Sequence, residues 1–104
     1  MGEFQNRAVK ALQFTQTEAN LTDPRERQEQ FLRTALRLYV AIGGRLADVG
    51  DCVGRISAAG QFKVEQEIGS MIIELSALSH MCDLDMMQAA KIELEKAIKA
   101  KAGL

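Results

Sequence analysis

The stretch that decides the fold of this chain runs from Phe31 to Ile56, FLRTALRLYVAIGGRLADVGDCVGRI. Its positions can be read at alternating intervals of four and three, the spacing of one face of an α-helix. One stripe holds Phe31, Ala35, Leu38, Ile42, Arg45, Val49, Cys52 and Ile56, and its neighbour holds Leu32, Leu36, Tyr39, Gly43, Leu46, Gly50 and Val53. Together they are too wide for one partner helix, so we expect a helix that packs on two sides within a bundle.

Two features interrupt this apolar face. Arg45 occupies a stripe position, and Gly43, Gly44 and Gly50 stand where Ala or Leu would stabilise a helix more. An interior glycine costs about 1 kcal/mol relative to alanine. We interpret the glycines as points of close helix approach; the alternative is a gap that admits a ligand.

The flanking sequence predicts where this helix begins and what precedes it. A first helix is expected from Phe4 to about Glu18. Asp23 and Pro24 then suit the N-cap and the first helical position, and Glu26 is placed to close a capping box. The long helix is expected to continue to about Ser57, with a kink near Gly50.

Two more helices complete the predicted fold. Gly60 suits a C-terminal cap, and a third helix is expected from Gln61 to about His80. Asp83 is the expected N-cap of a fourth helix from Leu84 to about Ala102. No stretch alternates with a period of two, so we expect no strands. The predicted fold class is an all-α four-helix bundle in one domain, residues 1–104.

Composition limits the possible partners and the compartment. The 104 residues are 47% hydrophobic with a net charge of −1, which predicts no nucleic-acid or membrane binding. No signal-peptide core is apparent, and Cys52 and Cys82 form no C-x-x-C, so we expect reduced core thiols in a cytoplasmic protein. A core of this size is modest and the double stripe is wide, so we expect a homodimer or a homotetramer.

Two segments, 36–48 (LRLYVAIGGRLAD) and 67–90 (EIGSMIIELSALSHMCDLDMMQAA), carry a resemblance to a known family. The first is similar to an L-x-x-E-x-G-E-L-A-E helix, and the second to an E-x-x-D helix followed by an apolar run, a turn and a helix that opens with Leu after an acidic cap. Over about Leu12 to Lys101 the chain thus resembles the MazG-like all-α nucleotide pyrophosphohydrolases, whose two acidic pairs bind magnesium.

The acidic pairs of that family fall here on Ile42 and Arg45, and on Glu67 and Ser70. Only Glu67 matches, so the resemblance implies it as the one catalytic residue. Magnesium prefers hard oxygen ligands, and a guanidinium would repel the cation. The resemblance therefore supports the fold more strongly than the activity, and we expect no cofactor.

Arg45 can be read in two ways. It can form an ion pair with Asp48 or with Glu67, because a buried guanidinium must be paired, and we favour this reading. Alternatively it replaces the metal as a phosphate-binding group for a nucleotide or another phosphate anion. A different alternative retains catalysis with magnesium held by shifted carboxylates, those of Asp48, Asp51, Glu67 and Glu74.

Other motifs have structural explanations. His80, Cys82, Asp83 and Asp85 could ligate a metal, but they lie where one predicted helix ends and the next begins, so we expect capping roles. Met71, Met81, Met86 and Met87 predict core or subunit contacts. The one histidine of the chain lies at the end of a predicted helix, so no Ser-His-Asp catalytic triad is predicted. The Gly43–Gly44 pair is expected inside a helix, unlike the glycines of a phosphate-binding loop.

Three functions fit these observations. The first is a MazG-like protein without pyrophosphohydrolase activity that serves as a binding or assembly module. The second is an active pyrophosphohydrolase that cleaves between the α- and β-phosphates with magnesium. The third is an unrelated helical interaction protein.

Overall fold

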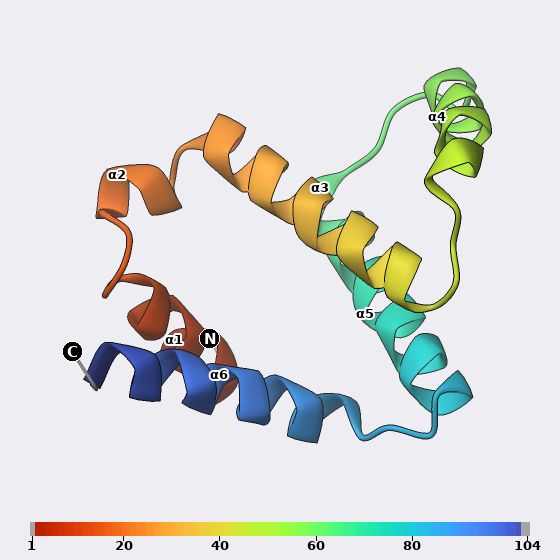
Figure 1. Cartoon of the computed structure of the whole chain (residues 1–104). Helices are drawn as coiled ribbons and strands as arrows, with labels where there is room; N and C mark the ends of the chain where they lie inside the picture. The colour runs from red at the N-terminus through yellow and green to blue at the C-terminus, as the bar shows by residue number, and fades with distance from the viewer. Residues whose placement is uncertain (1, 103–104) are drawn as a thin grey trace. The chain divides into compact units, whose positions relative to one another are not determined.

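The computed structural model of the chain describes residues 2–102, and within them it is helical, with six α-helices, one 3₁₀-helix and no strand (Figure 1). This confirms the all-α prediction. The chain divides into two compact units, residues 1–16 with 62–104 and residues 17–61. The predicted domain included residues 1, 103 and 104, which lie outside the described residues, and the four-helix bundle stays a prediction.

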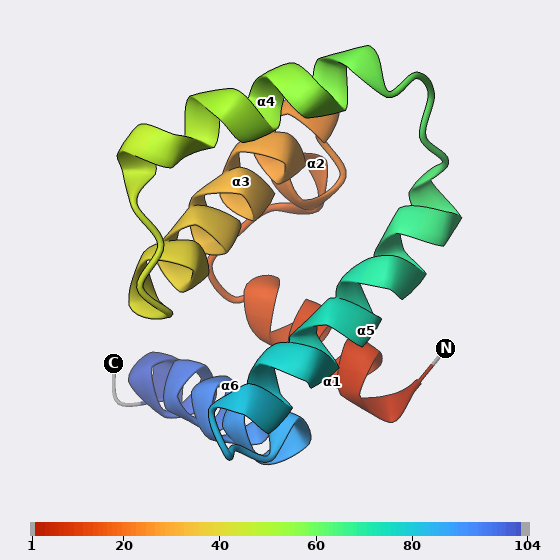
Figure 2. The ribbon, with the colours of Figure 1, turned by 90° about the vertical axis from the view of Figure 1, so that its right-hand side faces the viewer.

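The first unit contains α1 (Glu3–Leu12), α5 (Val64–Met81) and α6 (Met86–Ala102). α6 packs against α1, and it packs against α5 beyond the turn that joins them (Figures 1 and 2). Leu94 on α6 is 7% exposed and is the one buried large apolar side chain in the described part of the chain. The small core of this unit is therefore centred on α6.

α5 ends in a hydrogen-bonded turn of the Schellman type. Asp83 has a φ of 55°, and its N–H donates to the carbonyl of His80 at 3.2 Å. The N–H of Leu84 donates to the carbonyl of Ser79 at 2.8 Å. These two bonds satisfy carbonyls at the end of the helix, and the left-handed conformation of Asp83 directs the chain away from the helix axis.

The N-cap of α6 is Asp85, whose carboxylate accepts a hydrogen bond from the N–H of Gln88 at 2.8 Å. The prediction that Asp83 caps this helix is wrong, because the left-handed conformation of Asp83 closes α5 instead. The helix consequently begins at Met86 rather than at Leu84. α5 likewise begins at Val64, three residues after the predicted Gln61.

The second unit contains α2 (Glu18–Leu21), α3 (Pro24–Ala41), the 3₁₀-helix η1 (Leu46–Asp48) and α4 (Val49–Ala58). The predicted first helix is thus too long, since α1 ends at Leu12 and α2 is separate. Threonines explain the break: the Thr15 hydroxyl donates to the Leu12 carbonyl at 3.3 Å, and the Thr17 hydroxyl accepts from the Asn20 N–H at 3.2 Å.

α3 begins as predicted, with Pro24 at its first position and the Asp23 carboxylate accepting from the Arg25 N–H at 3.2 Å. The Asp23 N–H donates to the Asn20 carbonyl at 3.3 Å. The prediction that Glu26 closes a capping box is therefore wrong, because the Asp23 N–H bonds to Asn20 and the Glu26 carboxylate accepts from the Gln30 amide at 3.3 Å.

The predicted single long helix is wrong, because the chain reverses between α3 and α4 (Figure 2). Gly43 has a φ of +96°, a conformation that glycine adopts at little cost. The N–H of Gly43 donates to the Val40 carbonyl at 3.0 Å and that of Gly44 to the Tyr39 carbonyl at 2.8 Å, again a Schellman end. The Gly43–Gly44 pair therefore lies in a turn and not inside a helix.

Two predictions about small core residues are also wrong. Cys52 on α4 and Cys82 after α5 are free thiols, as expected, but both are exposed. Gly50 does not mark a close approach, since a Cβ built there would meet no atom within 4 Å. No helix in residues 2–102 combines the length and the apolar character needed to cross a membrane.

Candidate functional site

The turn after α3 holds the arginine that the sequence singles out. The Tyr39 hydroxyl donates to the backbone carbonyl of Arg45 at 3.0 Å. Gly44 makes this possible, because a Cβ there would lie 2.6 Å from the ring of Tyr39. The aromatic ring therefore folds back over the turn and fixes the backbone from which the Arg45 side chain extends.

The Arg45 guanidinium lies beside a carboxylate, with Nε 3.8 Å from the Asp48 Oδ2. This agrees with the favoured pairing of the two residues. The prediction that Arg45 is buried in a helical stripe is wrong, because its side chain is 77% exposed and precedes η1. At that exposure the pair is a surface ion pair, and water screens most of its energy.

The turn also separates the two positions that correspond to the family's first acidic pair. On a helix, residues three apart lie on one face, and this is how each acidic pair of that family would meet a metal ion. Ile42 is the C-cap of α3, and Arg45 follows the left-handed Gly43, so the two positions share no helical turn. Glu67 and Ser70, by contrast, both lie within α5 and one helical turn apart.

The four shifted carboxylates divide between the two units. Asp48 is the N-cap residue of α4 and Asp51 lies in its first turn. Glu67 lies in the first turn of α5 and Glu74 two turns further along the same side. Within residues 2–102, no group of three or more His, Cys, Asp or Glu side chains is arranged to hold a metal ion. The magnesium site stays a prediction.

The residues around His80 end one helix and begin the next, as expected, although Asp85 and not Asp83 is the N-cap of α6. The His80 carbonyl accepts from Asp83, Cys82 is the C-cap of α5, and Asp85 caps α6. The Ser76 hydroxyl donates to the Ile72 carbonyl at 2.9 Å, and the Met86 sulfur lies 3.8 Å from its oxygen, so α6 contacts α5 at this point. Met71, Met81 and Met87 are exposed on their helices.

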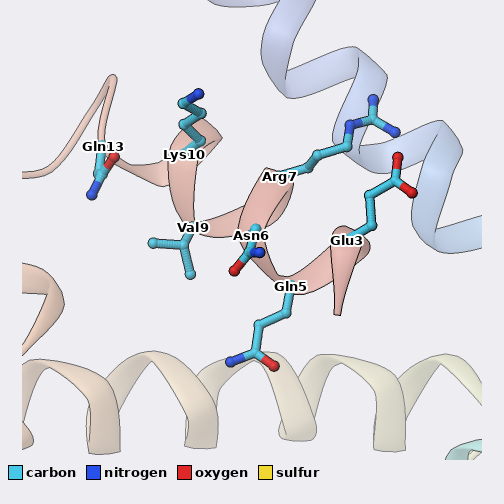
Figure 3. Close-up of a pocket in the computed structure, with 7 residues that line it drawn as sticks. All are labelled: Glu3, Gln5, Asn6, Arg7, Val9, Lys10 and Gln13. Carbon is cyan, nitrogen blue, oxygen red and sulfur yellow. The ribbon is translucent and has the colours of Figure 1, made fainter. Parts of the chain in front are cut away.

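A hollow along α1 was not singled out from the sequence. Figure 3 shows Glu3 and Arg7 reaching to one side of the helix and Gln5 to the other. The residues that line the hollow are Glu3, Gln5, Asn6, Arg7, Val9, Lys10 and Gln13. All belong to α1 or its C-cap, and six of the seven are polar or charged, which is what the solvent-facing side of any amphipathic helix provides.

The chain has also been compared with known proteins. No protein-family model matches it. The comparison with curated proteins finds no match, and the comparison with solved structures finds none.

Proposed function

We propose that this chain is a MazG-like helical assembly module without pyrophosphohydrolase activity, and that its functional form is a homo-oligomer, a dimer or a tetramer. The observation that carries the proposal is the exposure of its apolar side chains. Those exposed within their own unit include Phe31, Leu32, Leu46, Val53, Ile56, Phe62, Val64, Ile68, Ile72 and Ile73. Val64 and Ile68 recur at helical spacing on one side of α5, and exposed apolar stripes of this kind are typical of interaction surfaces.

The exposed area has the size that an obligate interface requires. The chain has an accessible surface of 8786 Å². Two separate compact proteins, each of half this mass, would together expose about 7,000 Å². The excess is about 1,800 Å² per copy, or about 3,600 Å² over two copies, and obligate homodimers bury about 2,000–5,000 Å² over both partners. Each unit is therefore less closely packed than a compact protein of its size.

The absence of pyrophosphohydrolase activity is proposed from the turn after α3. The positions of the first acidic pair hold an apolar Ile42 and a cationic Arg45, and a left-handed glycine separates them. Magnesium requires several oxygen ligands in near-octahedral geometry, which these side chains do not supply. The cytoplasmic location is proposed from the two free thiols, Cys52 and Cys82.

Sedimentation velocity at micromolar concentration, and after dilution, tests the assembly. We expect a dimer or a tetramer, and a stable monomer would overturn the proposal. Leu46→Glu should shift the distribution towards monomer, because Leu46 is 61% exposed in one copy and a charge buried at an interface is costly. Gln61→Glu adds the same charge in the loop after α4 and should leave assembly unchanged.

Turnover of a panel of nucleoside triphosphates with millimolar magnesium tests the loss of activity. We expect no release of pyrophosphate and no rise in melting temperature on adding magnesium. Specific binding at a hundredfold excess over Kd would stabilise the fold by about 2.7 kcal/mol. A magnesium-dependent rise that Glu67→Ala abolishes would instead support the shifted carboxylate site.

A phosphate-binding role is the second candidate, favoured by the exposure of the Arg45 guanidinium. Its Nε lies 3.8 Å from Asp48, which is longer than a hydrogen bond. Pyrophosphate added without magnesium should then raise the melting temperature of the wild type but not that of Arg45→Met. Equal behaviour of both proteins would leave Arg45 as the ion-pair partner of Asp48.

A further inference from the structure

α4 is short and rich in residues that disfavour a helix. It contains 10 residues, whereas α3 and α5 contain 18 each. Isolated helices shorter than about 12–15 residues are marginal in water even when they are rich in alanine. In α4 only Arg55 and Ala58 are among the strongest helix formers, and two of its residues are glycines, Gly50 and Gly54. The local sequence therefore gives α4 little helix stability of its own.

Neither capping nor packing within its own unit compensates for this composition. The Asp48 side chain makes no capping hydrogen bond to the first turn of α4, all of which is described. The Ser57 hydroxyl donates to the Val53 carbonyl at 3.0 Å, a bond of the kind that slightly destabilises helices. None of the 10 residues of α4, each of which is described, is buried, and Val53 and Ile56 are 54% and 53% exposed. Since most helices in proteins are stabilised by burial of an apolar side, α4 lacks the usual source of stability within residues 17–61.

Breaks in the helical backbone separate α4 from the helices on both sides. Before it, the hydrogen bonds of the Gly43–Gly44 turn close α3, and the Tyr39 hydroxyl donates to the Arg45 carbonyl at 3.0 Å. After it, Gly60 has a φ of +104°, and α5 begins at Val64. The bonds that close α3 use no atom of α4, so unfolding of α4 would leave them in place. Segments bounded in this way can open without the rest of the protein.

We propose that α4 is a conditional helix, which opens to a coil on its own while α3 and α5 remain helical. Its apolar side exists only in the folded form, because Val49, Val53 and Ile56, four and three residues apart, share a side only in a helix. Opening and closing of α4 therefore remove and restore this side, which makes the segment a local order–disorder switch. The inference goes beyond the proposed function, because it applies to a monomer as well as to an oligomer.

Hydrogen–deuterium exchange of the full-length chain, followed by mass spectrometry of its peptides, tests the switch. Relative to their intrinsic rates, the amides of α4 should exchange at least about tenfold faster than those in the middle of α3 and α5. Gly50→Ala combined with Gly54→Ala should slow the exchange of α4 by about fivefold or more, because alanine favours the helix. A Cβ built at either position meets no atom within 4 Å, so no clash opposes the change.

Gly69→Ala is the matched control. It makes the same substitution in α5, where a Cβ also meets nothing within 4 Å, and it should leave the exchange of α4 unchanged. If Gly69→Ala slowed α4 as much as the two substitutions in α4 do, the opening would belong to the whole fold and the proposal would be overturned.

The other outcomes are equally separate. Exchange of α4 as slow as that of α3 would overturn the proposal, since another surface would then cover α4 in the folded chain. Fast exchange that the two alanines leave unchanged would overturn it as well, because exchange would then not follow the helix–coil equilibrium. Sedimentation velocity on the same samples keeps the proposed function apart: a monomer with fast exchange in α4 contradicts the assembly and supports the switch.

Discussion

Removal of the N-cap of α6 should destabilise the fold by a predictable amount. The Asp85 carboxylate accepts a hydrogen bond from the N–H of Gln88 at 2.8 Å. Because Gln88 lies in the first turn of α6, no backbone carbonyl of the helix could accept from this N–H instead. Replacing an Asp N-cap by Ala costs about 1 kcal/mol, whereas Asn caps nearly as well as Asp. Asp85→Ala should therefore be less stable, and Asp85→Asn should stay close to the wild type.

The neighbouring Asp83 provides the opposite expectation. Its φ of 55° is a conformation that costs an ordinary residue about 1 kcal/mol and that glycine adopts freely. Asp83→Gly should therefore raise the free energy of unfolding by about 0.5–1 kcal/mol. Two aspartates two residues apart thus respond in opposite directions, although both substitutions remove one negative charge.

Urea unfolding followed by far-UV circular dichroism measures both effects, at one fixed protein concentration because association contributes to stability. A change of 1 kcal/mol corresponds to roughly 4–8 °C in melting temperature for a domain of this size. Equal stability of Asp85→Ala and Asp85→Asn would show that the cap contributes nothing. A destabilised Asp83→Gly would refute the assignment of the left-handed position.

Three further predictions follow from local geometry. Gly43→Ala should lower the free energy of unfolding by about 1 kcal/mol or more, because Gly43 has a φ of +96°. Gly54→Ala in α4, where an added Cβ would meet nothing within 4 Å, should raise it by up to about 1 kcal/mol, and thermal unfolding of the two variants checks both. A double-mutant cycle on Arg45 and Asp48 should give a coupling free energy below about 1 kcal/mol. A coupling free energy of several kcal/mol would mean that the ion pair is buried. Tyr39→Phe removes the 3.0 Å hydrogen bond to the Arg45 carbonyl and should cost about 0.5–1.5 kcal/mol in the same measurement, and no loss would show that this bond does not hold the turn.

Local chemistry made several features predictable from the sequence. The all-helical class follows from the helical spacing of apolar residues, and the start of α3 follows from Asp23 and Pro24, which act on their nearest neighbours. The end of α3 was missed because the apolar spacing continues through Gly43 as if the helix did. A glycine in that pattern is compatible with a helix interior and with a left-handed turn, and the spacing alone does not distinguish them.

In the candidate site, too, local pairing was predictable from the sequence and burial was not. The Arg45–Asp48 pair was predictable because residues three apart are neighbours in a helix or in a tight turn. The exposure of Arg45 was not, since burial depends on which surfaces cover a residue.

Spacing along the sequence therefore determined that these residues form amphipathic helices and which residues begin α3. Only the tertiary structure decided that the chain reverses after α3, that Leu94 is buried, and that neither α3 nor α5 has its large apolar side chains fully covered within its own unit. The physical reason is that helix formation and capping act over about four residues, whereas burial requires another surface to exclude water from the same side chain.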